Sequence, residues 1–469
     1  MIQPLLRSLQ RNKQINEGLK EEVRMMKRSL TSISAAAAGA VIILSGSLNN
    51  TATASAPYGS GQNYTLETSF AFENTTPAAA PIWTADIDKP AEHSRVIVPP
   101  VLNDNKVFYV KSGKLIARDM TKGKALWSFG AKLQGDTVTA ADGFVFVGDK
   151  SGNVFKVNPK TGKGAKIYQT KEKMISRVLA DDGALYIFSG TKLASIKISS
   201  GKLNWSVPSD SGGSGNTYML DNILLAGAME SGALTVNTYY AFDKMTGKTL
   251  WRMDGSHGAL LKVDGDRLYF NDDWPRMDGT EYLAKLDIVN AKTGTIIEGL
   301  KYGKPDPNMD NLGQSPKRVT IEGNTVYIVT QTDKVLFYKL TNDPNAVNAK
   351  SINTGGELIA GPYNGKFFYQ APSNLGIYGR KLSDGTLVYY EGLDNPASQV
   401  NFVHSGMYVG QTDGEVYALN VKTAKAEFRF QTDSRRYGPF QVAGNMLFVQ
   451  GEGKLYAFRL SNDLIKPIS

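Results

Sequence analysis

Oxygen-bearing side chains at alternating positions form the first candidate site, a calcium loop. Asp306, Asn308 and Asp310 lie two residues apart in a stretch between two predicted strands, and carboxylate and amide oxygens at this spacing are the ligands that calcium prefers. A complete calcium-binding hand would need Gly and a bidentate Glu where the chain has Asn311 and Lys317. The alternative is a polar turn in which Asn and Asp cap the local backbone.

A tryptophan among charged residues forms the second candidate site. The loop runs from residue 271 to residue 278 and contains the only Trp that is out of phase with the repeat described below. An exposed aromatic side chain flanked by charges on a rigid scaffold is typical of a recognition loop. The alternative is a Trp folded over the edge of a sheet. The candidate ligand-recognition residues are Asp272, Asp273, Trp274, Arg276 and Asp278.

Residues for catalysis are sparse. The chain has no Cys, and its three His residues, His93, His257 and His404, have no partner at ligand spacing. No nucleophile elbow, phosphate-cradling Gly loop or zinc spacing occurs, so we predict no catalytic residue. The lack of Cys also excludes disulfides, thiolate metal sites and a lipid-modified N-terminal Cys.

Composition favours a large, sheet-rich globular protein. The 469 residues include 22 Tyr, 19 Phe and 47 Gly, which suit a packed β-sheet core with many turns. The 53 basic and 44 acidic residues give a net charge of +9. Because no Lys-rich or Arg-rich block concentrates this charge, the charge favours anionic surroundings rather than nucleic acid. Independently of the charge, we expect the protein to be a monomer.

The N-terminal region has the order of a secretory signal peptide. From Met25 a charged stretch leads into a weakly apolar run over residues 30–48 and then into small residues, with Ala54 suited to cleavage. The alternative is an uncleaved membrane anchor, although polar residues interrupt the run. The predicted segments are 1–24, an extra segment that a start at Met25 or Met26 would omit; 25–54, signal peptide; 55–80, spacer; 81–461, one domain; and 462–469, tail.

From about residue 90 the sequence repeats with a period near 40. Each unit has two short apolar strands, a turn, and a further strand ending in an aromatic residue; in one copy Ala241 precedes Gly247 by six residues and Trp251 follows it by four. The turn Gly allows φ > 0, and the aromatic side chain covers the junction between sheets. The predicted structural repeat residues are Trp83, Trp127, Trp205, Gly247, Trp251, Gly385 and Phe428.

Nine such hairpins can be counted, whereas closed propellers usually have four to eight blades. We therefore predict an all-β closed β-propeller of eight or nine four-stranded antiparallel blades. The last repeat stops at Leu460 without an outer strand, while the sequence around Trp83 matches an outer-strand ending. An N-terminal strand should complete the last blade and leave no open edge.

These residues resemble the quinoprotein-like (PQQ-like) β-propeller repeat family. The family repeat is roughly Ala-x-Asp-x-x-Thr-Gly-Lys-x-x-Trp, and one copy matches it in full: Ala241, Asp243, Thr246, Gly247, Lys248 and Trp251. The resemblance implies the propeller fold. It does not imply one function, because the family includes quinone-dependent alcohol dehydrogenases, an outer-membrane assembly lipoprotein and sensor domains. A dehydrogenase of this type would need an adjacent Cys pair, so we do not expect pyrroloquinoline quinone (PQQ).

The sequence favours an exported, non-catalytic bacterial scaffold that binds a protein or an anionic cell-surface polymer such as a wall polysaccharide. We expect it to be secreted or associated with the cell wall, without a cofactor; calcium is the alternative. A second hypothesis is an enzyme, either a divergent quinone oxidoreductase or a carbohydrate-active propeller using Asp272, Asp273 and Asp278. A third is a membrane-anchored sensor with the propeller outside.

Overall fold

The computed structural model describes residues 74–90, 96–172, 174–209, 215–232, 234–253, 255–274, 281–304, 315–341, 350–352, 356–371 and 376–468. They belong to one compact unit, Glu73–Ser469. The predicted segments 1–24 and 25–54, and the spacer up to residue 73, lie outside the described residues and stay predictions.

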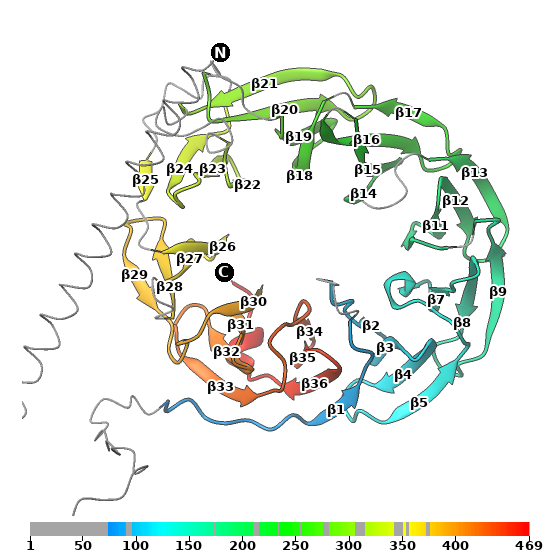
Figure 1. The fold of residues 1–469 in the computed structure, drawn as a ribbon, viewed down its shortest axis with the longest axis horizontal. Helices are drawn as coiled ribbons and strands as arrows, with labels where there is room; N and C mark the ends of the chain where they lie inside the picture. The colour runs from blue at the N-terminus through cyan, green and yellow to red at the C-terminus, as the bar shows by residue number, and fades with distance from the viewer. Residues whose placement is uncertain are drawn as a thin grey trace, which may run out of the picture. The chain divides into compact units, whose positions relative to one another are not determined.

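Nine four-stranded antiparallel sheets follow one another around a ring, as the continuous colour change in Figure 1 shows. We number these blades 1 to 9 in chain order from residue 101. The prediction of a closed, all-β propeller is therefore confirmed, and the number of blades is nine. Regular helix is limited, in the described part, to the one-turn η1 (Gly135–Thr137) and to α2 (Asn462–Ile465).

The strands of each blade run from the central opening outward. Blades 1 to 3 comprise β2 (Val101–Asn103), β3 (Lys106–Lys111), β4 (Lys114–Asp119) and β5 (Ala125–Phe129); β6 (Thr139–Ala141), β7 (Phe144–Gly148), β8 (Asn153–Val157) and β9 (Gly164–Gln169); and β10 (Arg177–Asp181), β11 (Ala184–Ser189), β12 (Lys192–Lys197) and β13 (Leu203–Pro208). Blades 4 to 6 comprise β14 (Thr217–Leu220), β15 (Ile223–Ser231), β16 (Thr235–Asp243) and β17 (Thr249–Arg252); β18 (His257–Asp264), β19 (Arg267–Asp272), β20 (Ala284–Asn290) and β21 (Ile296–Tyr302); and β22 (Arg318–Glu322), β23 (Thr325–Val329), β24 (Val335–Lys339) and β25 (Lys350–Ile352). Blades 7 to 9 comprise β26 (Glu357–Tyr363), β27 (Lys366–Gln370), β28 (Ile377–Lys381) and β29 (Leu387–Tyr389); β30 (Ala397–Val403), β31 (Gly406–Gln411), β32 (Glu415–Asn420) and β33 (Ala426–Gln431); and β34 (Gln441–Ala443), β35 (Met446–Gln450), β36 (Lys454–Arg459) and β1 (Trp83–Asp86).

The N-terminal strand β1 completes blade 9, as predicted. It pairs antiparallel with β36, with Trp83 opposite Ala457, and Figure 1 shows the first strand of the chain beside the last. Just before β1 the chain also reaches blade 8, where Ala79 N donates to Arg429 O and Arg429 N donates to Pro77 O. The two ends of the chain thus close the ring through backbone hydrogen bonds, which removes the sheet edge that an incomplete blade would expose.

Burial changes in a regular way across each blade. The second strand is almost wholly buried, as in β11, where all six residues are buried. The outer strand alternates instead: in β13, Trp205 faces inward and Leu203 is exposed. This pattern follows from the position of each strand, because both faces of a middle strand meet neighbouring blades while the outer strand borders solvent.

The hydrophobic core is divided into nine clusters of buried side chains, and each lies between two successive blades. Between blades 4 and 5, for example, Leu225 and Trp251 pack with Phe270. Between blades 9 and 1, Trp83 and Phe448 pack with Val107. No blade buries its faces alone, so stability resides in the junctions.

Four junctions share one tryptophan contact. The indole Nε1 of an outer-strand Trp donates to a backbone carbonyl in the next blade, and its ring covers the glycine of that blade's turn, where an added Cβ would lie within 3 Å of the ring. The pairs are Trp83 with Met120 O (2.9 Å) and Gly123, Trp127 with Pro159 O (3.0 Å) and Gly162, Trp205 with Lys244 O (3.0 Å) and Gly247, and Trp251 with Ala291 O (2.8 Å) and Gly294.

Other repeat positions depart from this contact. Gly385 has φ +75°, but no aromatic ring lies within 4 Å of the place that an added Cβ would take. The turn of blade 8 holds Ala424 at φ +63°, and there the Tyr390 hydroxyl donates to Val421 O (2.9 Å). Phe428 stacks on Phe458, with ring centroids 5.4 Å apart.

Replacing Gly247 with Ala should cost more stability than replacing Gly265 with Ala. Both glycines have positive φ, so each Ala carries a backbone cost of about 1 kcal/mol. At Gly247 the new Cβ would also lie 2.4 Å from Trp205 Cε3, whereas at Gly265 nothing lies within 4 Å. Overpacking should add about 1–3 kcal/mol in G247A. Thermal unfolding of both variants measures the difference; equal losses would contradict the tryptophan contact as a stabilising element.

Candidate functional site

The two ends of the ring differ in the chain connections that they carry. Because the strands of a blade alternate in direction, the hairpin between the second and third strands lies at the same end as the connection to the next blade. We call this end the crossing face; it includes the β3–β4 hairpin and the stretch from β5 to β6. The opposite end, the turn face, carries the tight turns between the first and second strands and between the third and fourth strands.

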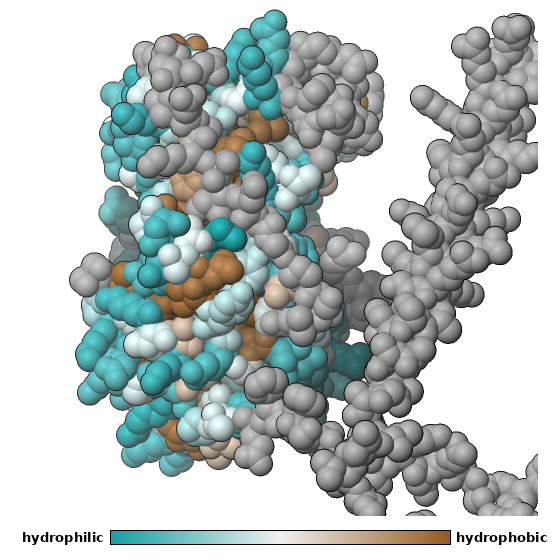
Figure 2. All heavy atoms as spheres, turned by 90° about the vertical axis from the view of Figure 1, so that its left-hand side faces the viewer, coloured by the Kyte–Doolittle hydropathy of each residue, from teal (hydrophilic) through white to brown (hydrophobic). Residues whose placement is uncertain are grey.

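Exposed apolar side chains are unevenly divided between these faces. Among the described residues, sixteen large apolar side chains are more than a third exposed, and eight of them lie on or beside the outer strands. Figure 2 shows part of this outer rim, where brown patches are separated by hydrophilic atoms. Two more, Met245 and Val263, lie toward the turn face. The remaining six lie at the crossing face: Val96, Val98, Met174, Met229, Leu234 and Trp274.

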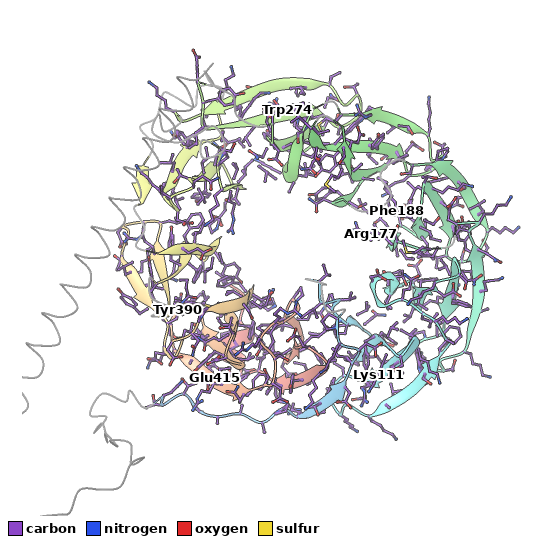
Figure 3. All side chains as sticks on the ribbon, in the orientation of Figure 1. Lys111, Arg177, Phe188, Trp274, Tyr390 and Glu415 are labelled. Atoms are coloured by element: carbon purple, nitrogen blue, oxygen red, sulfur yellow. The ribbon has the colours of Figure 1, made fainter. Side chains whose placement is uncertain are left out.

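The predicted recognition loop belongs to the crossing face, at the end of β19 on blade 5 (Figure 3). Asp272 is buried and accepts a hydrogen bond from Trp274 N (3.0 Å), and Asp273 N donates to Ser256 O (2.8 Å). The Trp274 side chain is 42% exposed, and its Nε1 lies beside Gly255. Thus Trp274 rests on its own blade with part of its ring open to solvent. Its role in recognition stays a prediction, and Arg276 and Asp278 lie outside the described residues.

A buried network of charges supports this loop. His257 Nε2 lies 3.1 Å from Asp287 Oδ2, while Lys285 Nζ lies 2.7 Å from Asp287 Oδ1 and 3.5 Å from Asp272 Oδ2. The side chains of His257, Asp272 and Asp287 are at most 5% exposed. These contacts tie the first three strands of blade 5 to one another beneath the loop, so they hold the base of the loop in place.

The network sets the charge states of two of its members. Burial acts to raise the pKa of Asp287, but hydrogen bonds from His257 and Lys285 outweigh it and hold that pKa below its usual range. Burial acts to lower the pKa of Lys285, yet its contacts with Asp287 and Asp272 hold the pKa above its usual value. Both groups are therefore charged near neutral pH.

A cavity of about 380 Å³ lies beside the network, between blades 4 and 5. Its lining includes Asn216, Tyr239, His257 and Asp273. The Tyr239 hydroxyl donates to Gly258 O (2.8 Å), and burial raises the pKa of that hydroxyl. His257 Nδ1 is buried without a hydrogen-bond partner in the described part of the chain.

Arg177, at the inner side of blade 3 in Figure 3, fixes the connection that borders this cavity. Its guanidinium donates to Gly215 O (3.0 Å) and to Thr217 Oγ1 (2.9 Å). One wall of the cavity is thereby anchored to the neighbouring blade.

Sequence reasoning did not single out the pairing of His257 with Asp287 and Lys285. These residues are about 30 positions apart, and only the register of β18, β19 and β20 brings them together. The one available signal is Asp287, a charged residue between Leu286 and Ile288 in β20.

The predicted calcium residues, Asp306, Asn308 and Asp310, lie outside the described residues. Within the part of the chain that the structure describes, no group of three or more His, Cys, Asp or Glu side chains is arranged to hold a metal ion. In the same residues, no helix is both long and apolar enough to cross a membrane.

A model of the family described as "Outer membrane protein assembly factor BamB" matches residues 75–179 and 164–395. The chain belongs to this PQQ-like β-propeller repeat family. The resemblance drawn from the repeat residues is confirmed. A comparison with curated proteins gives no match.

Several solved structures are similar to this PQQ-like chain at low sequence identity and with TM-scores below 0.5. BamB from Moraxella catarrhalis is 13% identical, with a TM-score of 0.43, covering 81% of this chain and 99% of that one. Sqt1 from Saccharomyces cerevisiae is 13% identical, with a TM-score of 0.44 and coverages of 80% and 99%. A quinohemoprotein alcohol dehydrogenase from Comamonas testosteroni is 14% identical, with a TM-score of 0.43 and coverages of 83% and 78%.

Replacing Asp287 with Asn should destabilise the propeller by about 3–5 kcal/mol near pH 7, because Lys285 would keep a partly buried charge without its closest partner. The wild-type carboxylate contributes stability that is fully present above its unfolded pKa of about 3.9 and is lost as the pH falls through its lower folded pKa. The difference in Tm between D287N and wild type should therefore shrink below about pH 4.

A matched control is D264N, which removes the exposed partner of Lys262 on the same blade. It should change the Tm little at any pH, since exposed ion pairs contribute little. A D287N variant as stable as D264N at pH 7 would contradict a supporting role for the buried network.

Proposed function

We propose that this PQQ-like propeller is an exported, non-catalytic scaffold that binds a protein partner through its crossing face. The observation that carries this proposal is the concentration of exposed Met, Leu, Val and Trp side chains on that face, compared with the turn face. Aromatic side chains and Met are enriched in protein interfaces, and Met adapts its shape to a partner. The family model, described as an assembly factor, agrees with a role in protein binding.

An anionic cell-surface polymer is the second candidate ligand. The net charge of +9 favours it. Mixed apolar and polar groups on the crossing face favour a protein more strongly, because a charged polymer would be held mainly by cations.

One other hypothesis fits the geometry less well, and a further one depends on residues outside the described part of the chain. A carbohydrate-active site built on Asp272 and Asp273 would need carboxylates that reach a substrate, whereas Asp272 is buried, 3.5 Å from Lys285 Nζ. A membrane-anchored sensor depends on retention of residues 25–54, which lie outside the described part of the chain.

Export predicts that the protein recovered from its native host begins at Ser55. Signal peptidase cleaves after small residues, and Ala52 and Ala54 supply them. Intact mass and N-terminal sequencing of the secreted protein measure the start. Recovery only in membranes with residues 25–54 retained would contradict secretion and support the anchored sensor instead.

A photo-crosslinking amino acid at Met229 should capture a protein partner, whereas the same amino acid at Met245 should not. Both side chains lie on blade 4 and are strongly exposed, 66% and 83%, but Met229 lies toward the crossing face and Met245 on the turn face. Irradiation of cells that produce each variant, followed by mass spectrometry of the adducts, measures the contact. Protein adducts from Met245 alone would place the binding surface on the turn face and contradict the proposal.

A further inference from the structure

Two nitrogen atoms on blade 5 lie near each other without hydrogen-bond partners in the described part of the chain. One is Nδ1 of His257, whose side chain is 2% exposed. The other is the indole Nε1 of Trp274, since only the main-chain N of that residue donates a hydrogen bond. Both lie beside Gly255: a Cβ on that glycine would be 3.0 Å from Trp274 Nε1 and 3.7 Å from His257 Nδ1. A buried polar atom without a partner costs free energy, so this place favours a ligand group that bonds both nitrogens.

The chemistry of the two nitrogens selects a hydroxyl group. The indole Nε1 is a donor only. Asp287 is ionised and accepts from Nε2–H of His257, so Nδ1 is an acceptor when the ring is neutral. An ammonium group cannot accept from Trp274, and an ionised carboxylate cannot donate to His257. A hydroxyl group does both, and its oxygen would also accept from Nδ1–H if the ring gained a second proton.

The cavity between blades 4 and 5 adjoins these nitrogens, since His257 lines it. Three exposed side chains, those of Asn216, Asn237 and Asp273, also belong to its lining. The two amide groups both donate and accept hydrogen bonds, and the carboxylate accepts them. Gly258 lets this carboxylate lie close to β18, because a Cβ there would be 2.8 Å from Asp273 Oδ2. The cavity therefore offers several further hydrogen bonds to one ligand.

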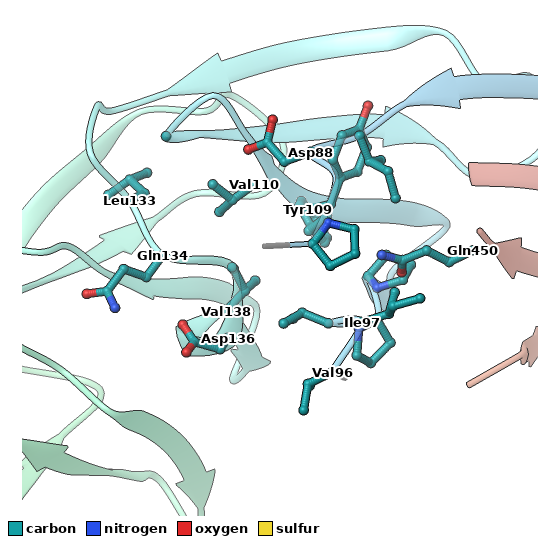
Figure 4. Close-up of a pocket in the computed structure, with 18 of the residues that line it drawn as sticks. Asp88, Val96, Ile97, Tyr109, Val110, Leu133, Gln134, Asp136, Val138 and Gln450 are labelled. Carbon is teal, nitrogen blue, oxygen red and sulfur yellow. The ribbon is translucent and has the colours of Figure 1, made fainter. Parts of the chain in front are cut away.

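A larger pocket on the crossing face, of about 470 Å³, has a different lining. It lies where blades 9, 1 and 2 meet, and Figure 4 shows Asp88 and Asp136 at its edge. Because Lys89, Lys132 and Lys150 line it too, charges of both signs are present and no ligand class is favoured. Among the described residues, by contrast, no Lys or Arg lines the cavity between blades 4 and 5. That cavity suits a neutral polar ligand better than an anion.

We propose that the cavity between blades 4 and 5 binds a neutral saccharide, with one sugar hydroxyl bridging Trp274 Nε1 and His257 Nδ1. A sugar ring carries several adjacent hydroxyl groups, which match the donors and acceptors of the lining. The volume of about 380 Å³ is within the range of small-ligand sites. Trp274 is 42% exposed, which leaves part of its ring for the apolar face of the sugar. The inference goes beyond the proposed function, since this ligand needs no protein partner.

The carboxyl groups at this place suit binding of a sugar rather than its cleavage. Glycoside hydrolysis generally uses two carboxyl groups that flank the scissile bond. Among the described residues that line the cavity, Asp273 supplies the one carboxyl group. Its neighbour Asp272 is buried, 3.5 Å from Lys285 Nζ. The saccharide is therefore held without being hydrolysed, which agrees with a non-catalytic scaffold.

The test applies the labelled mature protein to an array of immobilised neutral and anionic glycans and then titrates the tightest neutral glycan by calorimetry. We expect a neutral glycan to bind. W274F keeps the aromatic ring but removes Nε1–H, so it should bind that glycan about tenfold more weakly. G255A should weaken binding at least as much, because its Cβ, 3.0 Å from Trp274 Nε1 and 3.2 Å from His257 Cε1, would fill the space beside both nitrogens.

G265A is the matched control for G255A. It also places a side chain at positive φ on blade 5, but nothing lies within 4 Å of its new Cβ, so the affinity for the glycan should stay as in wild type. Thermal unfolding of each variant separates a loss of binding from a loss of folded protein.

A neutral glycan that binds wild type, W274F and G255A equally well would overturn the proposal, because the sugar would then bind elsewhere. Binding of anionic glycans alone would overturn it too, and so would binding of no glycan, which would leave water as the group that bonds the two nitrogens. Crosslinking from Met229 reports separately on the proposed function, because its readout is a protein adduct and not a bound sugar.

Discussion

The packing of each blade against the next, which in four of the nine junctions centres on an outer-strand tryptophan over a turn glycine, is the interaction on which the rest of the structure depends. A single blade leaves both of its faces apolar, so it is stable only against its neighbours. The tryptophan sets that packing: its ring needs a residue without a side chain beneath it, and its Nε1 needs a carbonyl at one position, as Trp205 finds in Gly247 and Lys244 O. The ring of nine junctions closes because β1 returns to β36.

The same constraint explains why the two faces of the propeller differ. On the turn face, an Asp or Asn four residues before the turn glycine accepts backbone N–H groups in four blades, through Asp119, Asn158, Asp243 and Asn290. At Asp243 the hydroxyl of Thr246 and these backbone groups together lower the pKa of the carboxyl group. The residues of those turns pack between blades, so few substitutions are expected to be tolerated there. The crossing face has connections of different lengths, with exposed side chains such as Met229 and Trp274. Binding is therefore expected at the connections, where the sequence departs from the repeat.

The repeat allowed the fold to be predicted in detail, because period, turn glycine and aromatic residue are all set by local geometry. The number of blades stayed at eight or nine even with Trp83 assigned to the last sheet, and the structure gives nine. The candidate sites were harder to predict, since they arise where the period fails. His257 and Asp287 meet through strand register. No spacing in the sequence signals this pair, and the alternatives for Trp274 differ only in side-chain placement.

The most direct test of the crossing face as the binding surface is hydrogen–deuterium exchange of the mature protein, alone and with the partner that co-purifies from its native host. The account predicts slower exchange on binding in crossing-face segments, such as the hairpin of β15 and β16 and residues 270–274 at the end of β19. The turn-face segment between β16 and β17 should be unchanged. Protection confined to the turn-face segments, with the crossing face unaffected, would contradict it.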